Sequence, residues 1–479
     1  LFILANNLFG GVLASALNAS FVDVHPSLSA TLHTGVQSLA AHPIFGAGPN
    51  HFLSQWLNFR PLLVNTNTLW DVPFSSGSSF LGTVAILGGG VGIIAVLLFL
   101  IAYVYESTRK LFAPNEERPS GSLPVFGLFM VAMYFLLSIV FFSPSITVLI
   151  CAFLFMGIFI GSLVGENRIP QREVHFLREQ RASFFSILVI VGLLMVSAGA
   201  VYAATVRFGA IVYYQMSIVD AQKGNLDVAN NRISKAIALS DMPVFERTRV
   251  VYAEQAIRDT LAKSSNNSSS DAVRTVLQNA ISIGNASSRA AIALDPSDPG
   301  NYLVLGDLLR LISPLKIEGV SAAAVEAYQK AIDLAPHYPK SYLSMAELYY
   351  DLGDNTNARD FVDKALKEKS NYTDAYFLLA QIEISDGNTN TAIARIKDAT
   401  VIDPNNPDTY FELGLLRYNS GDYTNAISAF HTTISLNPQY LNAWYYLALA
   451  DQKTGNTTEA IDILTALHKR LPDNQNVWD

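Results

Sequence analysis

A period of about 34 residues runs through the C-terminal third of the chain and constrains its fold more than any other feature. It is marked by proline, or by one serine in a proline's place, at Pro336, Ser370, Pro404, Pro438 and Pro472. A fixed period of roughly 20 to 50 residues is the signature of a repeat architecture, in which each unit buries its apolar face against its neighbours. We therefore expect this part of the chain to form a stack of similar units.

Each period also repeats side chains that suit two closely packed helices. Aromatic residues open a first helix, apolar and small residues follow, a glycine marks the turn, and an alanine lies in the second helix. In that order the positions are Tyr342, Tyr376, Tyr410 and Trp444; Met345, Leu379, Leu413 and Leu447; Ala346, Ala380, Gly414 and Ala448; Gly353, Gly387, Gly421 and Gly455; and Ala358, Ala392, Ala426 and Ala460. The sequence resembles the tetratricopeptide repeat family, which implies helix-turn-helix units stacked into a right-handed solenoid.

Weaker matches extend the repeats toward the N-terminus. The interval from Pro296 to Pro336 is 40 residues, which places six extra residues near 312–320. Further back, a degenerate unit starts close to residue 207, and terminal repeats are expected to be atypical. We assign residues 207–295 to degenerate repeat-like helices and residues 296–479 to the regular solenoid.

The first 206 residues have a different composition, with long stretches free of charge. A bilayer core requires roughly 20 apolar helical residues, so these stretches predict membrane spans. The predicted fold class is all-α, a polytopic helical membrane domain (residues 1–206) followed by the solenoid. The spans are expected near 80–104, 123–142, 146–164 and 183–205, with an external loop at about 18–77.

The chain begins inside an apolar run at residues 1–17, with Leu1 rather than Met at its start. We interpret this run as the tail of a further span and expect that earlier spans are missing from the sequence. A signal peptide is the alternative, although the run lacks a basic segment before it.

Basic residues predict the orientation. Of the eight Lys and Arg before residue 207, three lie at 109–118, four lie at 168–181, and Arg60 is the eighth. The positive-inside rule places the two basic loops in the cytoplasm. The chain is thus predicted to cross the plasma (inner) membrane several times, with the loop at 18–77 and the solenoid outside the cytoplasm.

Charge and cysteine content narrow the possible functions. The solenoid carries the whole formal charge of −8, from 24 basic and 32 acidic residues. This balance gives no support to nucleic-acid binding. The single cysteine, Cys151, lies in a predicted span, so the external regions are expected to lack disulfides. Glycines at 88–92 lack the Lys and Ser/Thr of a phosphate-binding loop and are expected to serve close helix packing.

The external loop contains the segment His42-Pro-Ile-Phe-Gly-Ala-Gly-Pro-Asn-His-Phe, and the following span contains Gly88-Gly89-Gly90-Val91-Gly92. Over about residues 1–165 the chain resembles the O-antigen ligase and polymerase family. The resemblance implies transfer of a glycan from a polyprenyl diphosphate carrier to an acceptor hydroxyl at the outer face of the membrane, without a metal or other cofactor. Members commonly carry a His-Asn pair where this chain has serines at 75–79.

Three loop residues are candidates for that chemistry. Arg60 is the only external cation of the membrane half and is the first choice for stabilising a diphosphate leaving group. His51 and Asp71 are candidates for the base that activates the acceptor hydroxyl. Each has a structural alternative, because loop arginines often anchor interfaces and loop histidines and acids often cap turns or helices.

A ladder of side chains, each one period after the last, is the candidate binding groove of the solenoid: Leu343, Phe377, Phe411 and Tyr445. Aromatic rings there could stack on sugars or receive apolar side chains of a partner, and the alternative is that they extend the core. Two functions stay open. We favour a glycan ligase or polymerase whose partners are membrane lipids, a lipid-linked glycan, and an envelope protein or glycan in the groove. The alternative is a non-catalytic, membrane-tethered scaffold for envelope protein assembly.

Overall fold

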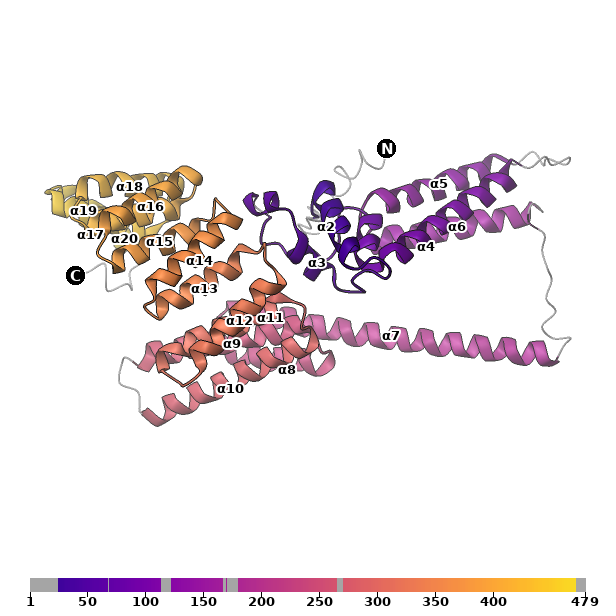
Figure 1. Ribbon diagram of the computed structural model, residues 1–479, viewed down its shortest axis with the longest axis horizontal. Helices are drawn as coiled ribbons and strands as arrows, with labels where there is room; N and C mark the ends of the chain where they lie inside the picture. Colours follow the sequence, from indigo (N-terminus) through magenta and orange to yellow (C-terminus); the bar gives the residue numbers. More distant parts are fainter. Residues whose placement is uncertain are drawn as a thin grey trace. The chain divides into compact units, whose positions relative to one another are not determined.

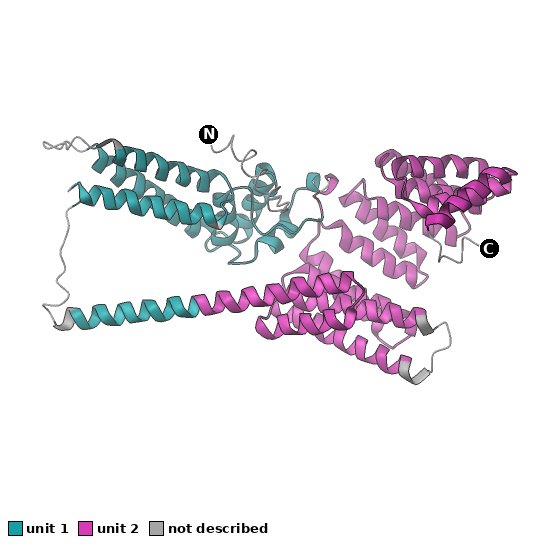
Figure 2. Ribbon diagram, turned by 180° about the vertical axis from the view of Figure 1, so that it is seen from behind, with its two compact units in different colours: residues 1–64, 71–200 teal, residues 65–70, 201–479 magenta. Residues whose placement is uncertain are grey.

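The computed structural model describes residues 25–67, 69–112, 122–166, 169, 180–264 and 270–470. Within them every regular element is helical and no strand is present, so the all-α prediction is confirmed (Figure 1). The interpretation of residues 1–17 as a span lies outside the described residues. The chain divides into two compact units (Figure 2). The first comprises Leu1–Val64 and Asp71–Ala200, and the second comprises Asn65–Trp70 and Val201–Asp479.

The first unit contains three helices that pack together and are long and apolar enough to cross a membrane. They are α4 (Phe80–Leu111), α5 (Ser122–Phe141) and α6 (Ile146–Gly165). Their shared core includes Tyr103, Phe129 and Phe159. Ser145 caps the start of α6, so the predicted break between the second and third spans is a tight hairpin. Short helices precede α4: α2 (Leu28–Ala41), α3 (Phe52–Phe59) and the 3-10 helix η1 (Leu62–Thr66).

Helix α4 is interrupted at Gly89, where φ is 59° and ψ is −156°. Two donors and two acceptors that lose their helical partners bond to the loop at residues 43–48 instead. Their distances are 2.9 Å for Gly90 N to Pro43 O, 3.0 Å for Val91 N to Ile44 O, 2.9 Å for Ala47 N to Ile86 O and 3.0 Å for Gly48 N to Leu87 O. Backbone groups at membrane depth require such partners. A loop inserted into the break, rather than packing of whole helices alone, accounts for these glycines.

Helix α7 (Gln180–Gln222) is the fourth helix that is apolar and long enough to span a membrane. It has no break, and its last turns already pack in the solenoid. Ala210 lies in one core cluster with Ala229 and Ile233 of α8 (Leu226–Leu239). Gly224, with φ of 79°, forms the turn between them. The first helical pair therefore continues directly from the apolar helix α7.

The second unit stacks helical pairs up to residue 470. After α8 the first helices are α9 (Pro243–Ser264), α11 (Pro299–Ile312), α13 (Pro339–Asp351), α15 (Thr373–Ser385), α17 (Pro407–Asn419) and α19 (Leu441–Thr454). The second helices are α10 (Ser270–Leu294), α12 (Val320–Leu334), α14 (Asn355–Glu368), α16 (Thr389–Ile402), α18 (Tyr423–Leu436) and α20 (Thr457–Arg470). The six extra residues form the connection that includes the 3-10 helix η2 (Ser313–Leu315).

The repeated residues have the structural roles that their positions in the period predict. The turn glycines at 353, 387, 421 and 455 all have positive φ, between 78° and 93°, which favours glycine. At the small position, a Cβ added to Gly414 would lie 2.5 Å from the ring of Phe430. Ala358, Ala392 and Ala426 are fully buried. Close approach of paired helices thus explains both the glycines and the alanines of the period.

Candidate functional site

The predicted ladder lies partly inside the solenoid core. Leu343 is 4% exposed and Phe411 is 8% exposed. The ring of Phe411 lies 5.0 Å from that of Tyr440. Phe377 is half-buried against the core of the next repeat, and Tyr445 is half-buried beside Tyr446. Leu343 and Phe411 therefore offer little surface to a ligand, and the binding role of the ladder stays a prediction.

A different set of side chains runs across the first helices, several of which contact one another directly, as α9 does with α11 and α11 with α13. We name this set the charged row. Its members influence one another electrostatically from α9 to α17. It comprises the carboxylates Glu254, Asp307, Glu347, Asp351, Asp374, Asp408 and Glu412 and the cations Arg258, Arg310 and Lys340, and Lys369, which follows α14, also acts on Asp374. Seven carboxylates thus face four cations, so the row is acidic.

The centre of the row is an ion-pair network between α11 and α13. Arg310 Nη1 lies 2.9 Å from Glu347 Oε2 and 3.4 Å from Asp351 Oδ2. Asp307 accepts a hydrogen bond of 2.7 Å from the hydroxyl of Tyr328. One guanidinium therefore serves two carboxylates while a third is held by a phenol.

Partial burial makes the charge of this row costly. Desolvation, followed by the nearby charge of Asp307, raises the pKa of Glu254 to about 7. Desolvation is also the main cause that raises the pKa of Asp307 and Glu347, both of which are half-buried. Carboxylates whose pKa is raised in this way are stabilised by an additional cation close by.

One carboxylate oxygen of the row lacks a hydrogen bond. The Oε1 atom of Glu254 is buried and has no hydrogen-bond partner in the structure. A buried, unpaired carboxylate oxygen costs free energy. Because the atom is buried, a cation bound near the row would offset this cost by electrostatic attraction and not by a direct hydrogen bond.

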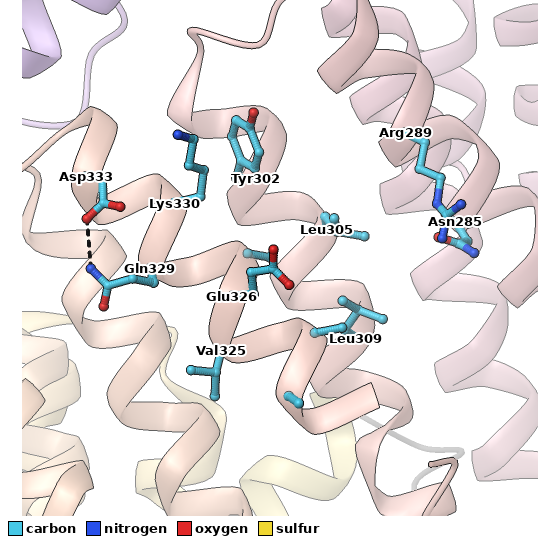
Figure 3. A pocket seen from close by; sticks show the side chains of 13 residues that line it. Asn285, Arg289, Tyr302, Leu305, Leu309, Val325, Glu326, Gln329, Lys330 and Asp333 are labelled. Carbon is cyan, nitrogen blue, oxygen red and sulfur yellow. Dashed lines mark hydrogen bonds between the residues drawn. The ribbon is translucent and has the colours of Figure 1, made fainter. Parts of the chain in front are cut away.

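A cavity of about 850 Å³ lies on another part of the solenoid, between α10, α11 and α12 (Figure 3). Its charged side chains balance, with Arg289 and Lys330 against Glu326 and Asp333. Gln329 donates a hydrogen bond of 2.9 Å to Asp333 within the lining. The cavity therefore lacks the excess of one charge that distinguishes the row, and it provides a matched control surface.

The three candidates for glycan transfer lie in the region before α4. Arg60 is the C-cap of α3 and is only 1% exposed. His51 precedes the first residue of α3 and is half-buried, whereas Asp71 is exposed. The catalytic roles of Arg60, His51 and Asp71 stay predictions. Among the described residues, no group of three or more His, Cys, Asp and Glu side chains could hold a metal ion.

The family model described as "Tetratricopeptide repeat" matches residues 318–382 and 418–479. The C-terminal region consists of tetratricopeptide repeats. Curated proteins yielded no sequence match. Neither comparison supports the resemblance to O-antigen ligases, which therefore stays a prediction.

Several solved structures are similar to this chain. PilW, titled a widely conserved type IV pilus biogenesis factor, is 16% identical, with 47% of this chain and 96% of that chain covered and a TM-score of 0.35. PilF of Pseudomonas aeruginosa is 14% identical, with 48% of this chain and 96% of that chain covered and a TM-score of 0.33. YrrB, titled a TPR protein with an unusual peptide-binding site, is 20% identical, with 40% of this chain and 95% of that chain covered and a TM-score of 0.29. Similarity at this level assigns no function to the chain.

The charged row was missed at the level of sequence, although one signal was present. Lys340, Asp374 and Asp408 occupy the same position in three consecutive repeats.

Proposed function

We propose that this chain is a membrane-tethered tetratricopeptide scaffold whose charged row binds a cationic segment of a partner protein. The observation that carries the proposal is the row itself, in which the pKa of Glu254 rises to about 7 because of desolvation and the charge of Asp307. A lysine or arginine side chain entering the row would stabilise the ionised carboxylates. Solenoids of this type present extended surfaces suited to such a segment.

The scaffold would lie in the plasma (inner) membrane with its solenoid outside the cytoplasm, where an envelope protein is the expected partner. Four helices of sufficient length and apolarity support the membrane location. Arg109 and Lys110 lie in the last turn of α4 and Arg118 follows that helix, while the second cluster lies between the end of α6 and the first turn of α7. This placement supports the orientation. With four crossings, the loop before α4 and the solenoid share one side.

The test uses the full chain, purified in detergent, and two short labelled peptides of alternating lysine and alanine or glutamate and alanine. We expect the lysine peptide to bind, with an affinity that falls as salt rises, and the glutamate peptide not to bind. Asp374→Asn combined with Glu412→Gln should weaken binding of the lysine peptide about tenfold, which is about 1.4 kcal/mol.

The control is Glu326→Gln combined with Asp333→Asn, which removes two carboxylates from the cavity of Figure 3 and should leave binding unchanged. Equal affinity for the two peptides would refute the proposal. The proposal would also be refuted if the control variant lost as much affinity for the lysine peptide as the row variant. Binding would then depend only on the net charge of the chain.

Outer-leaflet glycan transfer from a polyprenyl diphosphate carrier is a second candidate, favoured by one observation. The loop at residues 43–48 and the glycines of α4, the two parts of the predicted signature, are joined by backbone hydrogen bonds. If Arg60 serves the leaving group, Arg60→Ala in the complete protein should abolish accumulation of the surface glycan while membrane insertion is retained. Unchanged glycan would end the catalytic assignment of Arg60.

A further inference from the structure

Six residues from the loop before α4, Asn65–Trp70, belong to the second unit (Figure 2). The side chain of Asn65 is fully buried there. Its Nδ2 donates hydrogen bonds of 2.8 Å to His337 O and 3.0 Å to Glu368 O. His337 follows α12 and Glu368 ends α14, so one amide group bridges the connections that follow two successive second helices.

A buried lysine completes the contact from the solenoid side. Lys369 is 6% exposed, and its Nζ donates hydrogen bonds of 2.8 Å to Asn65 O and to Asn371 Oδ1. The ammonium also lies 5.2 Å from the centre of the Trp70 ring. Asn371 Nδ2 donates to Thr66 O at 3.0 Å. Burial of an ammonium requires such partners, and here the loop segment supplies two of them.

Trp70 is received by aromatic side chains of the same two connections. Its ring centre lies 6.1 Å from that of Tyr338 and 5.1 Å from that of Tyr372. Tyr338 and Tyr372 are one period apart and so hold equivalent positions in consecutive repeats. The spacing of the repeats therefore sets the width of the site that the indole enters.

The solenoid departs from its own period at this place. Ser370 replaces the proline found at 336, 404 and 438, and Lys369 stands where other repeats have Ala335 and Asp403. None of the equivalent residues Ala335, Asp403 and Asn437 carries a cation that could lie near the Trp70 ring. Of the two exceptional residues, Lys369 is thus the one that contacts the loop segment.

We propose that the connections at residues 335–338 and 369–372 form a recognition site for an extended chain segment, and that Asn65–Trp70 is its intramolecular ligand. We name this contact the clasp. It lies entirely within the second unit. It does not depend on the ligand of the charged row.

Cysteine cross-linking in the full chain tests the clasp. On a Cys151→Ser background, Thr66→Cys with Asn371→Cys should form a disulfide under mild oxidation, detected by mass spectrometry of the linked peptides. The matched control is Thr66→Cys with Asn405→Cys, because Asn405 is exposed and equivalent to Asn371 one repeat further on. Equal yields for the two pairs would overturn the proposal.

Substitution of the lysine tests specificity. In the cross-linking chain, Lys369→Ala should lower the yield about fivefold, the effect of losing about 1 kcal/mol. Lys367→Ala, which removes an exposed charge two residues away, should leave the yield unchanged. No effect of Lys369→Ala would contradict the clasp.

The Asn65→Ala substitution leaves the solenoid sequence unchanged, so hydrogen exchange of this variant can be compared directly with that of the unsubstituted chain. We expect faster exchange at residues 369–372 and unchanged exchange in α17 and α18. Unchanged exchange at 369–372 would also overturn the proposal, and faster exchange throughout the solenoid would show a general loss of fold instead of a local clasp.

Discussion

At the scale of single residues, the charged row shows how a solenoid can keep acids at a site where their ionisation is costly. Packing of the alternating helices determines the fold, so the first helices can carry acids at partly buried positions without loss of the period. Residues such as Glu254 and Asp307 then reduce stability when ionised. Buried groups that oppose stability are frequently retained for binding.

Glu254→Gln provides a test of this cost. The folded-state pKa of Glu254 is raised from 4.5 to about 7, so the folded chain holds this proton more tightly than the unfolded chain. Stability from this group is present below pH 4.5 and is lost as the pH rises to about 7. The substitution should therefore raise the free energy of unfolding more at pH 8 than at pH 5, by about 2 kcal/mol.

Chemical denaturation of the full chain in detergent at the two pH values measures this difference. Glu318→Gln, at an exposed position, is the control and should show no such difference. A Glu254→Gln effect that is the same at pH 5 and pH 8 would remove the electrostatic argument for the row.

What the sequence can predict at this scale depends on whether a residue acts within its own repeat. The turn glycines and core alanines act locally, and their roles followed from their spacing. The burial of Arg60 could not be predicted from spacing, because it depends on how the loop folds. Asn65 and Lys369 lie 304 residues apart, and no repeat spacing connects a loop residue with a residue of the solenoid.

At the scale of elements, the interrupted helix α4 is the main departure from a simple bundle. Gly46 and Gly89 meet backbone to backbone, and a Cβ added to Gly89 would lie 2.3 Å from Gly46 N. Both residues have positive φ, 66° and 59°. The loop segment and the glycine cluster were both evident in the sequence. The contact between them was not, because backbone hydrogen bonds leave no pattern of side chains.

Gly89→Ala should destabilise the first unit by about 3 kcal/mol, because the new methyl group meets backbone that has no rotamer to change. Gly127→Ala in α5 is the matched control, since a Cβ there meets nothing within 4 Å, and its stability should stay the same or rise slightly. Thermal unfolding in detergent compares the two variants. Equal transition temperatures would show that the loop does not enter the break.

At the scale of the whole molecule, the uninterrupted helix α7 runs from the unit that holds the other candidate spans into the repeat unit, and the proposed clasp lies within the repeat unit. Composition and period predicted the all-α class and the tetratricopeptide repeats. They could not predict that Asn65–Trp70 belongs to the second unit, since this loop has no repeat character. The clasp also requires the loop before α4 and the solenoid to occupy the same compartment, as four crossings allow.

Labelling of single cysteines in spheroplasts tests the central claim, a membrane-tethered scaffold whose solenoid lies outside the cytoplasm. On the Cys151→Ser background, Asn405→Cys places a thiol on the solenoid, and Glu106→Cys places one at the end of α4 beside the first basic cluster. A membrane-impermeant maleimide should label Asn405→Cys in intact spheroplasts and Glu106→Cys only after permeabilisation. The reverse pattern would contradict the account.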